Sequence, residues 1–116
     1  MENSRVYRIK FAVVYELYIQ KAEKKGRKKA EVDTVLSWLT GYDETALAEH
    51  ISKQSDLQTF FDQAVRLNPN ASKITGMICG CRVEVIEDKL MQKIRYMDKL
   101  IDELAKGKPM EKILRK

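Results

Sequence analysis

Apolar residues recur at helical spacing in the first part of the chain. They are Phe11, Val14, Tyr15, Tyr18 and Ala22, with Leu17 beside them. Polar residues occupy most positions on the other side, so the pattern predicts an amphipathic helix. Lysines gather in its last turn, where they suit the negative end of the helix dipole, and Gly26 is placed to adopt a left-handed conformation. This first helix is therefore expected to end near Lys25.

The same periodicity returns from Lys28 to Thr40. Its apolar positions are Val32, Val35, Leu36 and Leu39. Gly41 follows directly, and glycine commonly ends a helix. The pattern predicts a second helix that ends at Gly41.

Two shorter helices are expected next. Asp43 offers a side-chain cap to a helix through Leu47 and Ile51. Ser55, with Gln58 three residues later, has the spacing of a capping box for a fourth helix. The apolar face of that fourth helix consists of Phe60, Phe61, Ala64 and Val65.

The segment after the turn at Asn68-Pro69-Asn70 fits two patterns. Ile74, Met77, Ile78, Cys81 and Val85 have helical spacing, whereas Cys81, Val83 and Val85 alternate with polar residues as in a strand. A lone strand is unstable, and no second convincing strand is found elsewhere. We therefore predict helix through about Cys79 and leave 81–86 as an irregular or strand-like segment.

The strongest helical pattern runs from Asp88 to Lys106. Its stripe consists of Leu90, Ile94, Met97, Ile101 and Leu104. A last short helix is expected between Met110 and Arg115. The fold class predicted is all-α, a compact bundle of about five or six helices in one domain, 1–116, with the long helix packed against the first two.

Composition narrows the class of protein. Of 116 residues, 44% are apolar and 34% charged, enough to form one core with a solvated surface. The sequence contains no run of about 20 apolar residues, so we expect no membrane span and no membrane partner. Only two cysteines occur, which favours a cytoplasmic location. The net charge of +5 is distributed in a basic, acidic, basic order that suits either an acidic partner or subunit pairing.

Five cations surround one glycine between the first two predicted helices. They are Lys24, Lys25, Arg27, Lys28 and Lys29. Such a junction can bind phosphates or nucleic acid, although a lysine-rich helix end followed by a polar loop has the same composition. The second helix is too apolar for a recognition helix in a DNA groove.

Aromatic and acidic residues define a second candidate site. Trp38 and Tyr42 flank a predicted helix end. In an alternative hypothesis the protein is a small-molecule enzyme, with a pocket between these two residues and Glu84, Glu87 and Asp88. Core packing of the aromatics and helix capping by Asp88 explain the same residues structurally.

Other chemistry has weaker support. Cys79 and Cys81 supply two thiols, but a structural zinc needs about four ligands and only His50 is added. We predict no metal and no cofactor, and expect the thiols to be small buried groups. His50 has no recognisable nucleophile motif beside it, so no catalytic residues are predicted.

Strings along nearly the whole chain carry a resemblance. They are Ala22-Glu23-Lys24-Lys25-Gly26-Arg27, Val32-Asp33, Trp38-Leu39-Thr40-Gly41-Tyr42, Asn68-Pro69-Asn70, Ile74-Thr75-Gly76, Cys79-Gly80, Ile86-Glu87-Asp88, Leu90-Met91, Ile94-Arg95-Tyr96 and 98–107. In this order they resemble the bacterial domain-of-unknown-function family 2200. The resemblance implies a bacterial, cytoplasmic, stand-alone domain and supplies no catalytic residues.

The leading hypothesis is a small interaction protein without catalytic activity. Apolar stripes are plentiful, catalytic constellations are absent, and the charge blocks can complement one another across an interface. The partner predicted is a second copy of the chain, in a homodimer.

Overall fold

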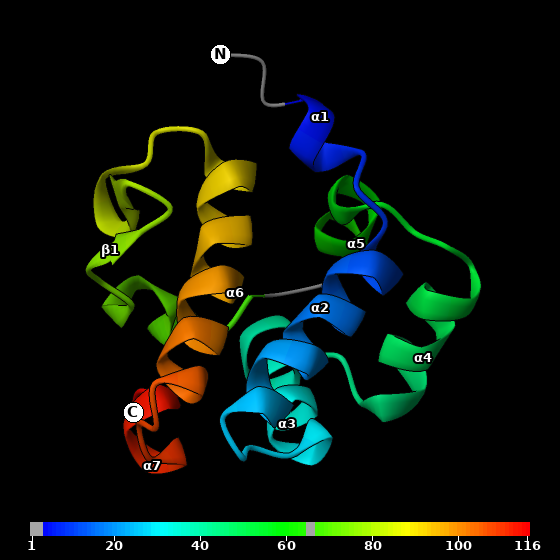
Figure 1. The fold of residues 1–116 in the computed structure, drawn as a ribbon. Helices are drawn as coiled ribbons and strands as arrows, with labels where there is room; N and C mark the ends of the chain where they lie inside the picture. The colour runs from blue at the N-terminus through cyan, green and yellow to red at the C-terminus, as the bar shows by residue number, and fades with distance from the viewer. Residues whose placement is uncertain (1–3, 65–66) are drawn as a thin grey trace.

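A long helix, α6, runs through the middle of the molecule with the other elements arranged around it (Figure 1). The computed structural model describes residues 4–64 and 67–116. The elements in this part of the chain are α1 (Ser4–Tyr7), α2 (Phe11–Lys24), α3 (Lys29–Thr40), α4 (Glu44–Ser52), α5 (Leu57–Asp62), the 3-10 helix η1 (Pro69–Lys73), β1 (Met77–Ile78), β2 (Cys81–Arg82), the 3-10 helix η2 (Val83–Val85), α6 (Lys89–Ala105) and α7 (Met110–Ile113). The mostly helical class predicted from the sequence is confirmed.

Glycines end the first two long helices, as predicted. Gly26 and Gly41 have φ of 78° and 79°, a left-handed conformation that costs glycine little because it lacks Cβ. Lys25 is the C-cap of α2. Gly41 is the C-cap of α3, and its N–H donates to the carbonyl of Ser37.

The next two helix starts are set by aspartates. Asp43 accepts a hydrogen bond from the backbone N–H of Ala46 at 2.8 Å, which confirms the predicted cap of α4. The cap of α5 is Asp56, which accepts from the N–H of Thr59 at 2.8 Å, so the predicted capping box at Ser55 is wrong. The Ser55 hydroxyl instead lies 2.8 Å from Nδ1 of His50. Val65 lies outside the described residues.

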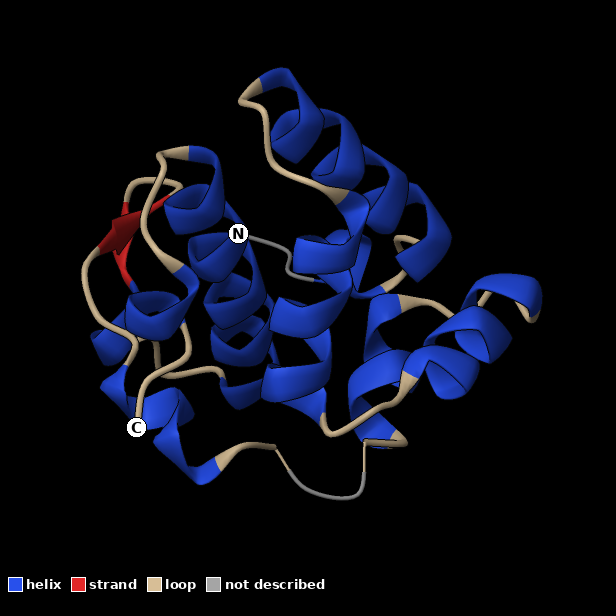
Figure 2. Cartoon of the chain, turned by 90° about the horizontal axis from the view of Figure 1, so that it is seen from below, coloured by secondary structure: helices blue, strands red, loops and turns tan. Residues whose placement is uncertain are grey.

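The predicted helix through Cys79 is also wrong, because this segment forms a β-hairpin. Met77 pairs with Arg82, and Ile78 pairs with Cys81, in antiparallel register. The two turn residues, Cys79 and Gly80, have φ of 50° and 79°, and two successive positive φ values are the mark of a type I′ turn. The strand that lacked a partner in the sequence pattern thus pairs with the residues just before it. The strands lie at the edge of an otherwise helical molecule (Figure 2).

Helix α6 supplies the centre of the core. Asp88 accepts from the N–H of Met91 at 3.0 Å and so begins the helix where the sequence predicted. The helix packs against α2 and α3, as expected, and also against α5, α7, β1 and η2. Its fully buried residues are Ile94, Met97, Leu100, Ile101 and Leu104.

The start of α2 is tied to the start of α5. The N–H of Phe11 donates to the carbonyl of Ser55 at 2.8 Å, and the N–H of Leu57 donates to the carbonyl of Ile9 at 2.9 Å. The rings of Phe11 and Phe60 stack with centroids 4.0 Å apart. These contacts fix the direction in which α2 presents its outer face.

Candidate functional site

Helix α2 is apolar on two faces. Its inner face buries Phe11, Tyr15, Tyr18 and Ala22 in the core. On the outer side Val13 and Leu17 are 52% and 57% exposed, and Ile9, just before the helix, is 40% exposed. We call Ile9, Val13 and Leu17 the α2 stripe. They are three of the five large hydrophobic residues that are exposed in the described part of the chain, so exposed apolar surface is concentrated here.

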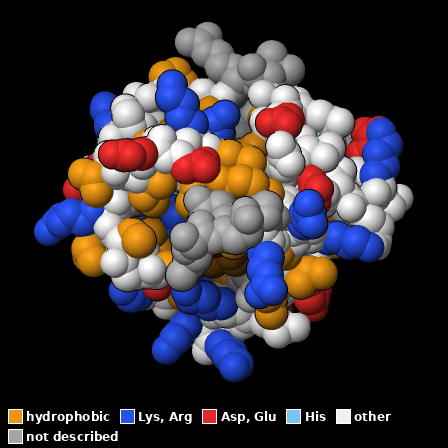
Figure 3. Space-filling view, turned by 90° about the horizontal axis from the view of Figure 1, so that it is seen from above, with side chains coloured by type: hydrophobic (Ala, Val, Ile, Leu, Met, Phe, Trp, Pro, Cys, Tyr) orange, Lys and Arg blue, Asp and Glu red, His pale blue; other side chains and the backbone are white. Residues whose placement is uncertain are grey.

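A shallow groove of about 220 Å³ borders the α2 stripe. Its lining residues come from α1, α2, α5, α6 and the segment that precedes α2: Val6, Ile9, Val14, Leu17, Tyr18, Leu57, Ile94, Arg95 and Asp98. We call this the α1–α2–α6 groove. The view onto this end of the molecule shows hydrophobic side chains gathered near the centre of the face, with lysines and arginines around them (Figure 3).

The polar edge of the groove is satisfied internally. The Tyr18 hydroxyl donates to the carboxylate of Asp98, and Arg95 Nη1 donates to the same carboxylate at 2.8 Å. Burial and the neighbouring Asp98 carboxylate raise the pKa of Tyr18 well above its usual value. The groove therefore has an apolar wall and a neutral, already hydrogen-bonded polar edge, which suits a protein surface better than a charged ligand.

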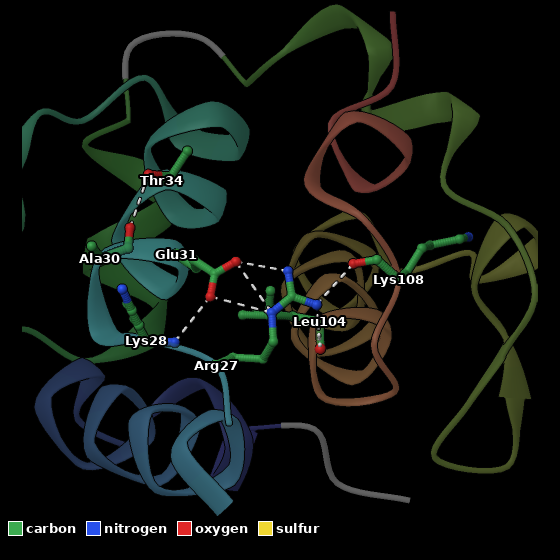
Figure 4. Close-up of polar contacts among 7 residues, drawn as sticks. All are labelled: Arg27, Lys28, Ala30, Glu31, Thr34, Leu104 and Lys108. Atoms are coloured by element: carbon green, nitrogen blue, oxygen red, sulfur yellow. Dashed lines mark hydrogen bonds and ion pairs between the residues drawn. The ribbon is translucent and has the colours of Figure 1, made fainter. Parts of the chain in front are cut away.

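The fold separates the five predicted cations of 24–29 into those that are engaged within the protein and those that are exposed. Arg27 turns inward: Nη2 lies 2.7 Å from Oε2 of Glu31, and Nη1 donates to the carbonyls of Leu104 and Lys108 at 3.3 and 3.0 Å (Figure 4). Its pKa is raised by the hydrogen bond to Glu31. Arg27 thus joins the α2–α3 turn to the end of α6 and has few donors left for a phosphate.

Lys29 is likewise engaged within the protein. Its Nζ lies 2.8 Å from Oδ2 of the buried Asp33 and 5.6 Å from the centroid of the Tyr15 ring. The Tyr15 hydroxyl donates to the other oxygen of Asp33 at 2.5 Å. The hydrogen bond to Asp33 raises the pKa of Lys29, and burial raises the pKa of Tyr15. The five predicted cations thus reduce to Lys24, Lys25 and Lys28, which are exposed and have no ion-pair partner among the described residues.

A cavity of about 340 Å³ lies beside this network. Tyr15, Lys29 and Asp33 line it together with four residues of α4: Glu44, Leu47, Ala48 and Ile51. The two carboxylate oxygens of Asp33 are both used by Tyr15 and Lys29. These polar side chains therefore stabilise the packing of α2 against α3, and Asp33 has no carboxylate oxygen left without a partner for a ligand.

The residues of the predicted Trp38/Tyr42 pocket do not meet in one site. Tyr42 donates to the carbonyl of Phe60 at 2.6 Å. Glu84 accepts from the N–H of Gly76 at 3.0 Å, beside the hairpin. The hairpin and α4, next to which Tyr42 lies, are on opposite sides of the molecule (Figure 1). Trp38 packs half-buried against the core, Glu87 is exposed, and Asp88 caps α6 and accepts from Tyr7.

Tyr42 does line a smaller cleft, of about 160 Å³, between α4 and α5. The imidazole of His50 lies there with its centroid 4.8 Å from that of Tyr42. Burial, and next the charge of Lys53, lowers the pKa of His50, and burial raises the pKa of Tyr42 to about 12. At neutral pH both side chains are uncharged.

The two thiols were expected to be buried, and this expectation is wrong. Cys79 and Cys81 are free and exposed at the end of the hairpin. Arg95 Nη1 lies 3.5 Å from Sγ of Cys79. In the described residues, no three histidine, cysteine, aspartate or glutamate side chains are grouped as metal ligands.

The α2 stripe is the feature that the sequence patterns had not singled out. Leu17 was assigned to the side of the helix that packs, and Val13 and Ile9 were not used. Their spacing of four residues was the available signal, because it places a second apolar row on the polar side of α2.

The site and the fold define the chain as a small, mostly helical protein with an exposed apolar surface. Residues 5–115 match the family model described as an uncharacterised protein conserved in bacteria, DUF2200, and the chain belongs to this family. It is similar to the solved "Crystal structure of uncharacterized protein SP1917", with 45% identity over 98% of this chain and 93% of that one and a TM-score of 0.91. No curated protein matches the chain. None of the helices in 4–64 and 67–116 has both the length and the apolar character needed to cross a bilayer.

Proposed function

We propose that this protein is a non-enzymatic interaction protein that self-associates as a homodimer through the α2 stripe and the α1–α2–α6 groove. The observation that carries the proposal is the exposure of Ile9, Val13 and Leu17 on one line, next to a groove lined largely by apolar side chains. Monomeric proteins seldom expose a contiguous apolar patch of more than a few hundred Å², and burying apolar surface is favourable by about 25 cal/mol per Å².

Symmetry strengthens this use of a small surface. In a twofold dimer each contact occurs twice, so the three residues of the α2 stripe contribute six side chains. A stable interface buries about 800 Å² on each partner, more than three side chains supply. The α1–α2–α6 groove therefore has to be part of the same interface.

Sedimentation velocity across the micromolar range tests the proposal. We expect the wild type to be dimeric and Leu17→Asp to be monomeric, because the substitution places a charge in the interface. Val85→Asp is the matched control: Val85 is 66% exposed but lies next to the hairpin. A wild type that sediments as a monomer throughout the range would refute self-association.

Polyanion binding through the end of α2 is the second candidate. It is supported by the exposed Lys24, Lys25 and Lys28, which have no ion-pair partner among the described residues and lie on either side of one turn. The logarithm of the binding constant for duplex DNA should fall with that of salt with a slope of about −0.9 per phosphate contact, so three lysines predict a slope near −3 rather than the value for five. The triple Gln variant should lose retention on heparin, and a double Gln variant at the exposed Lys89 and Lys112 should keep it.

We also propose a cytoplasmic location. The exposed, unpaired thiols of Cys79 and Cys81 support it, because reducing compartments preserve such thiols. A fractionated bacterial culture probed with an antibody against the protein tests it, and recovery in the periplasmic or extracellular fraction would contradict it.

A further inference from the structure

We propose that the hairpin turn Cys79-Gly80-Cys81 is a thiol–disulfide exchange site that reacts with a small anionic disulfide. Cys79 attacks the disulfide, and Cys81 then displaces the bound half by forming a disulfide with Cys79. The site modifies the chain itself. It is independent of the proposed self-association, because neither cysteine lines the α1–α2–α6 groove.

The two thiols are accessible and close together in the chain. Both are free and exposed at the end of the hairpin, at the edge of the molecule (Figure 2). Cα atoms two residues apart are separated by at most about 7 Å, and Gly80 between them bends the chain with φ of 79°. A disulfide usually joins Cα atoms about 4.4–6.8 Å apart. An exposed thiol with a second thiol this near is the arrangement in which a mixed disulfide is resolved within one chain.

An arginine of α6 distinguishes Cys79 from Cys81. Arg95 Nη1 lies 3.5 Å from Sγ of Cys79, whereas no arginine or lysine of the described residues donates a hydrogen bond to Cys81. The thiolate is the form of cysteine that attacks a disulfide, and an adjacent arginine favours it. Cys79 is therefore the attacking thiol and Cys81 the resolving one.

Arg95 is held in this position by its other partners. The same Nη1 donates to Asp98 at 2.8 Å, and the Tyr18 hydroxyl donates to that carboxylate as well. Because Nη1 carries two hydrogens, it serves Asp98 and Cys79 together. Burial lowers the pKa of Arg95, but the hydrogen bond to Asp98 and the electrostatic interaction with Cys79 raise it overall. The guanidinium therefore stays charged beside the sulfur.

A second cation of α6 determines the class of disulfide. Lys99, one turn after Arg95, donates from Nζ to the carbonyl of Met77 in the hairpin at 3.1 Å. Asp98 balances the charge of Arg95, but Lys99 has no ion-pair partner among the described residues. Positive charge around an exposed site raises the local concentration of anions. The reagent that fits is a small disulfide with carboxylates, such as oxidised glutathione.

The exchange takes two steps, and no further oxidant is needed. The Cys79 thiolate attacks one sulfur of oxidised glutathione, its S–S bond breaks, and one glutathione leaves as a thiolate that takes a proton from water. The Cys81 thiolate then attacks the sulfur of Cys79 and releases the second glutathione in the same way. The two cysteines lose two electrons, which the glutathione disulfide gains.

Single-thiol variants test the two roles. With oxidised glutathione at pH 7, the wild type should form the Cys79–Cys81 disulfide, and Cys81→Ser should stop at a mixed disulfide on Cys79. Cys79→Ser should form its mixed disulfide about fivefold more slowly, as expected for the loss of one partly exposed charge contact. Intact-mass spectrometry over time measures all three. Equal rates for the two single-thiol variants, or a wild type that keeps one bound glutathione without closing the disulfide, would overturn the proposal.

Substitution of Arg95 in each single-thiol background tests the source of the difference. Arg95→Gln should slow the reaction of Cys79 about fivefold and leave that of Cys81 unchanged. Arg95→Lys keeps the charge and should recover most of the rate, which a purely structural effect would not do. Lys106→Gln is the matched control, because it removes one charge at the far end of α6, where Lys106 is 73% exposed. Equal slowing of both thiols, or no recovery with lysine, would contradict the role of Arg95. Circular dichroism verifies that each variant is folded.

Discussion

The guanidinium of Arg27 donates a hydrogen bond to the backbone carbonyl of Leu104, 3.3 Å away in the last turn of α6. Carbonyls at a helix C-terminus have no partner within the helix. The Leu104 carbonyl also accepts from the backbone N–H of Gly107 at 3.1 Å, and the arginine adds a charged donor to it, while Glu31 balances the charge of the arginine at 2.7 Å. An element that the sequence marked as a binding segment thus contains a residue that holds the fold together.

Replacing Arg27 should destabilise the protein. Arg27→Met removes charge-assisted hydrogen bonds to the two carbonyls and to Glu31, and we expect a loss of about 1–3 kcal/mol in the free energy of unfolding. Urea denaturation followed by circular dichroism measures it. Lys25→Met, at an exposed lysine of the same turn, should change stability by less than about 0.5 kcal/mol. Equal stabilities for the two variants would contradict the structural role of Arg27.

His50 should make folding sensitive to mild acid. Burial lowers its pKa in the folded protein, so the unfolded chain binds the proton more tightly. Stability from this group is complete above the unfolded pKa of about 6.5 and decreases as pH falls toward the lower folded pKa. His50 is the only histidine of the sequence, so a single imidazole signal in NMR reports its titration.

The matched control for this pH effect is His50→Gln. The variant should be less stable than the wild type at pH 7.5, because it loses the packing against Tyr42 and Phe60. Between pH 7.5 and 5.5, however, its unfolding free energy should change less than that of the wild type. A wild-type imidazole that titrates above 6.5 would contradict the prediction.

The hairpin turn should respond to its two central residues in opposite directions. Gly80→Ala places a Cβ on a residue with φ of 79°, although the space around it is open, so conformational strain alone should cost about 1–2 kcal/mol. Cys79→Asn should be neutral or stabilising, because asparagine favours the first position of a type I′ turn. Thermal unfolding measures both, and a Gly80→Ala variant as stable as the wild type would argue against positive φ at this position.

Substitutions of core and of surface apolar residues should differ clearly in their effect on the free energy of unfolding. Leu100 is 0% exposed at the centre of α6, and Leu100→Ala should cost about 2–5 kcal/mol through lost contacts and a residual cavity. Val85→Ala, at a residue 66% exposed, should cost less than about 0.5 kcal/mol. Comparable losses from the two would mean that Leu100 does not pack in the core as described.

Structural features that depend on residues adjacent in the sequence were predicted well. Gly26 and Gly41 end their helices, and Asp43 and Asp88 begin theirs, because a cap or a left-handed turn depends on a few consecutive residues. The predicted capping box at Ser55 was wrong for a tertiary reason. Both side chains can cap, but the Ser55 hydroxyl is engaged by His50, so Asp56 caps α5.

The first strand of the hairpin, Met77–Ile78, was missed because its signal is too short. Two-residue strands give no alternation to detect, and the turn uses a positive φ at Cys79, which is uncommon outside glycine. The apolar residues of this segment match helical spacing by chance. The exposure of the two thiols follows from the hairpin, whose end projects away from the core.

The same division between local and tertiary determinants applies to the α2 stripe and to the basic residues near the end of α2. The sequence by itself determined the long helices, most of their ends and the apolar inner face of α2, because these depend on periodicity and local hydrogen bonding. Only the tertiary structure decided that Arg27 and Lys29 are engaged within the protein, by Leu104, Lys108 and Asp33, and that Ile9, Val13 and Leu17 stay uncovered. Whether a cation or an apolar side chain is free depends on which distant elements pack beside it, and that is a property of the assembled fold.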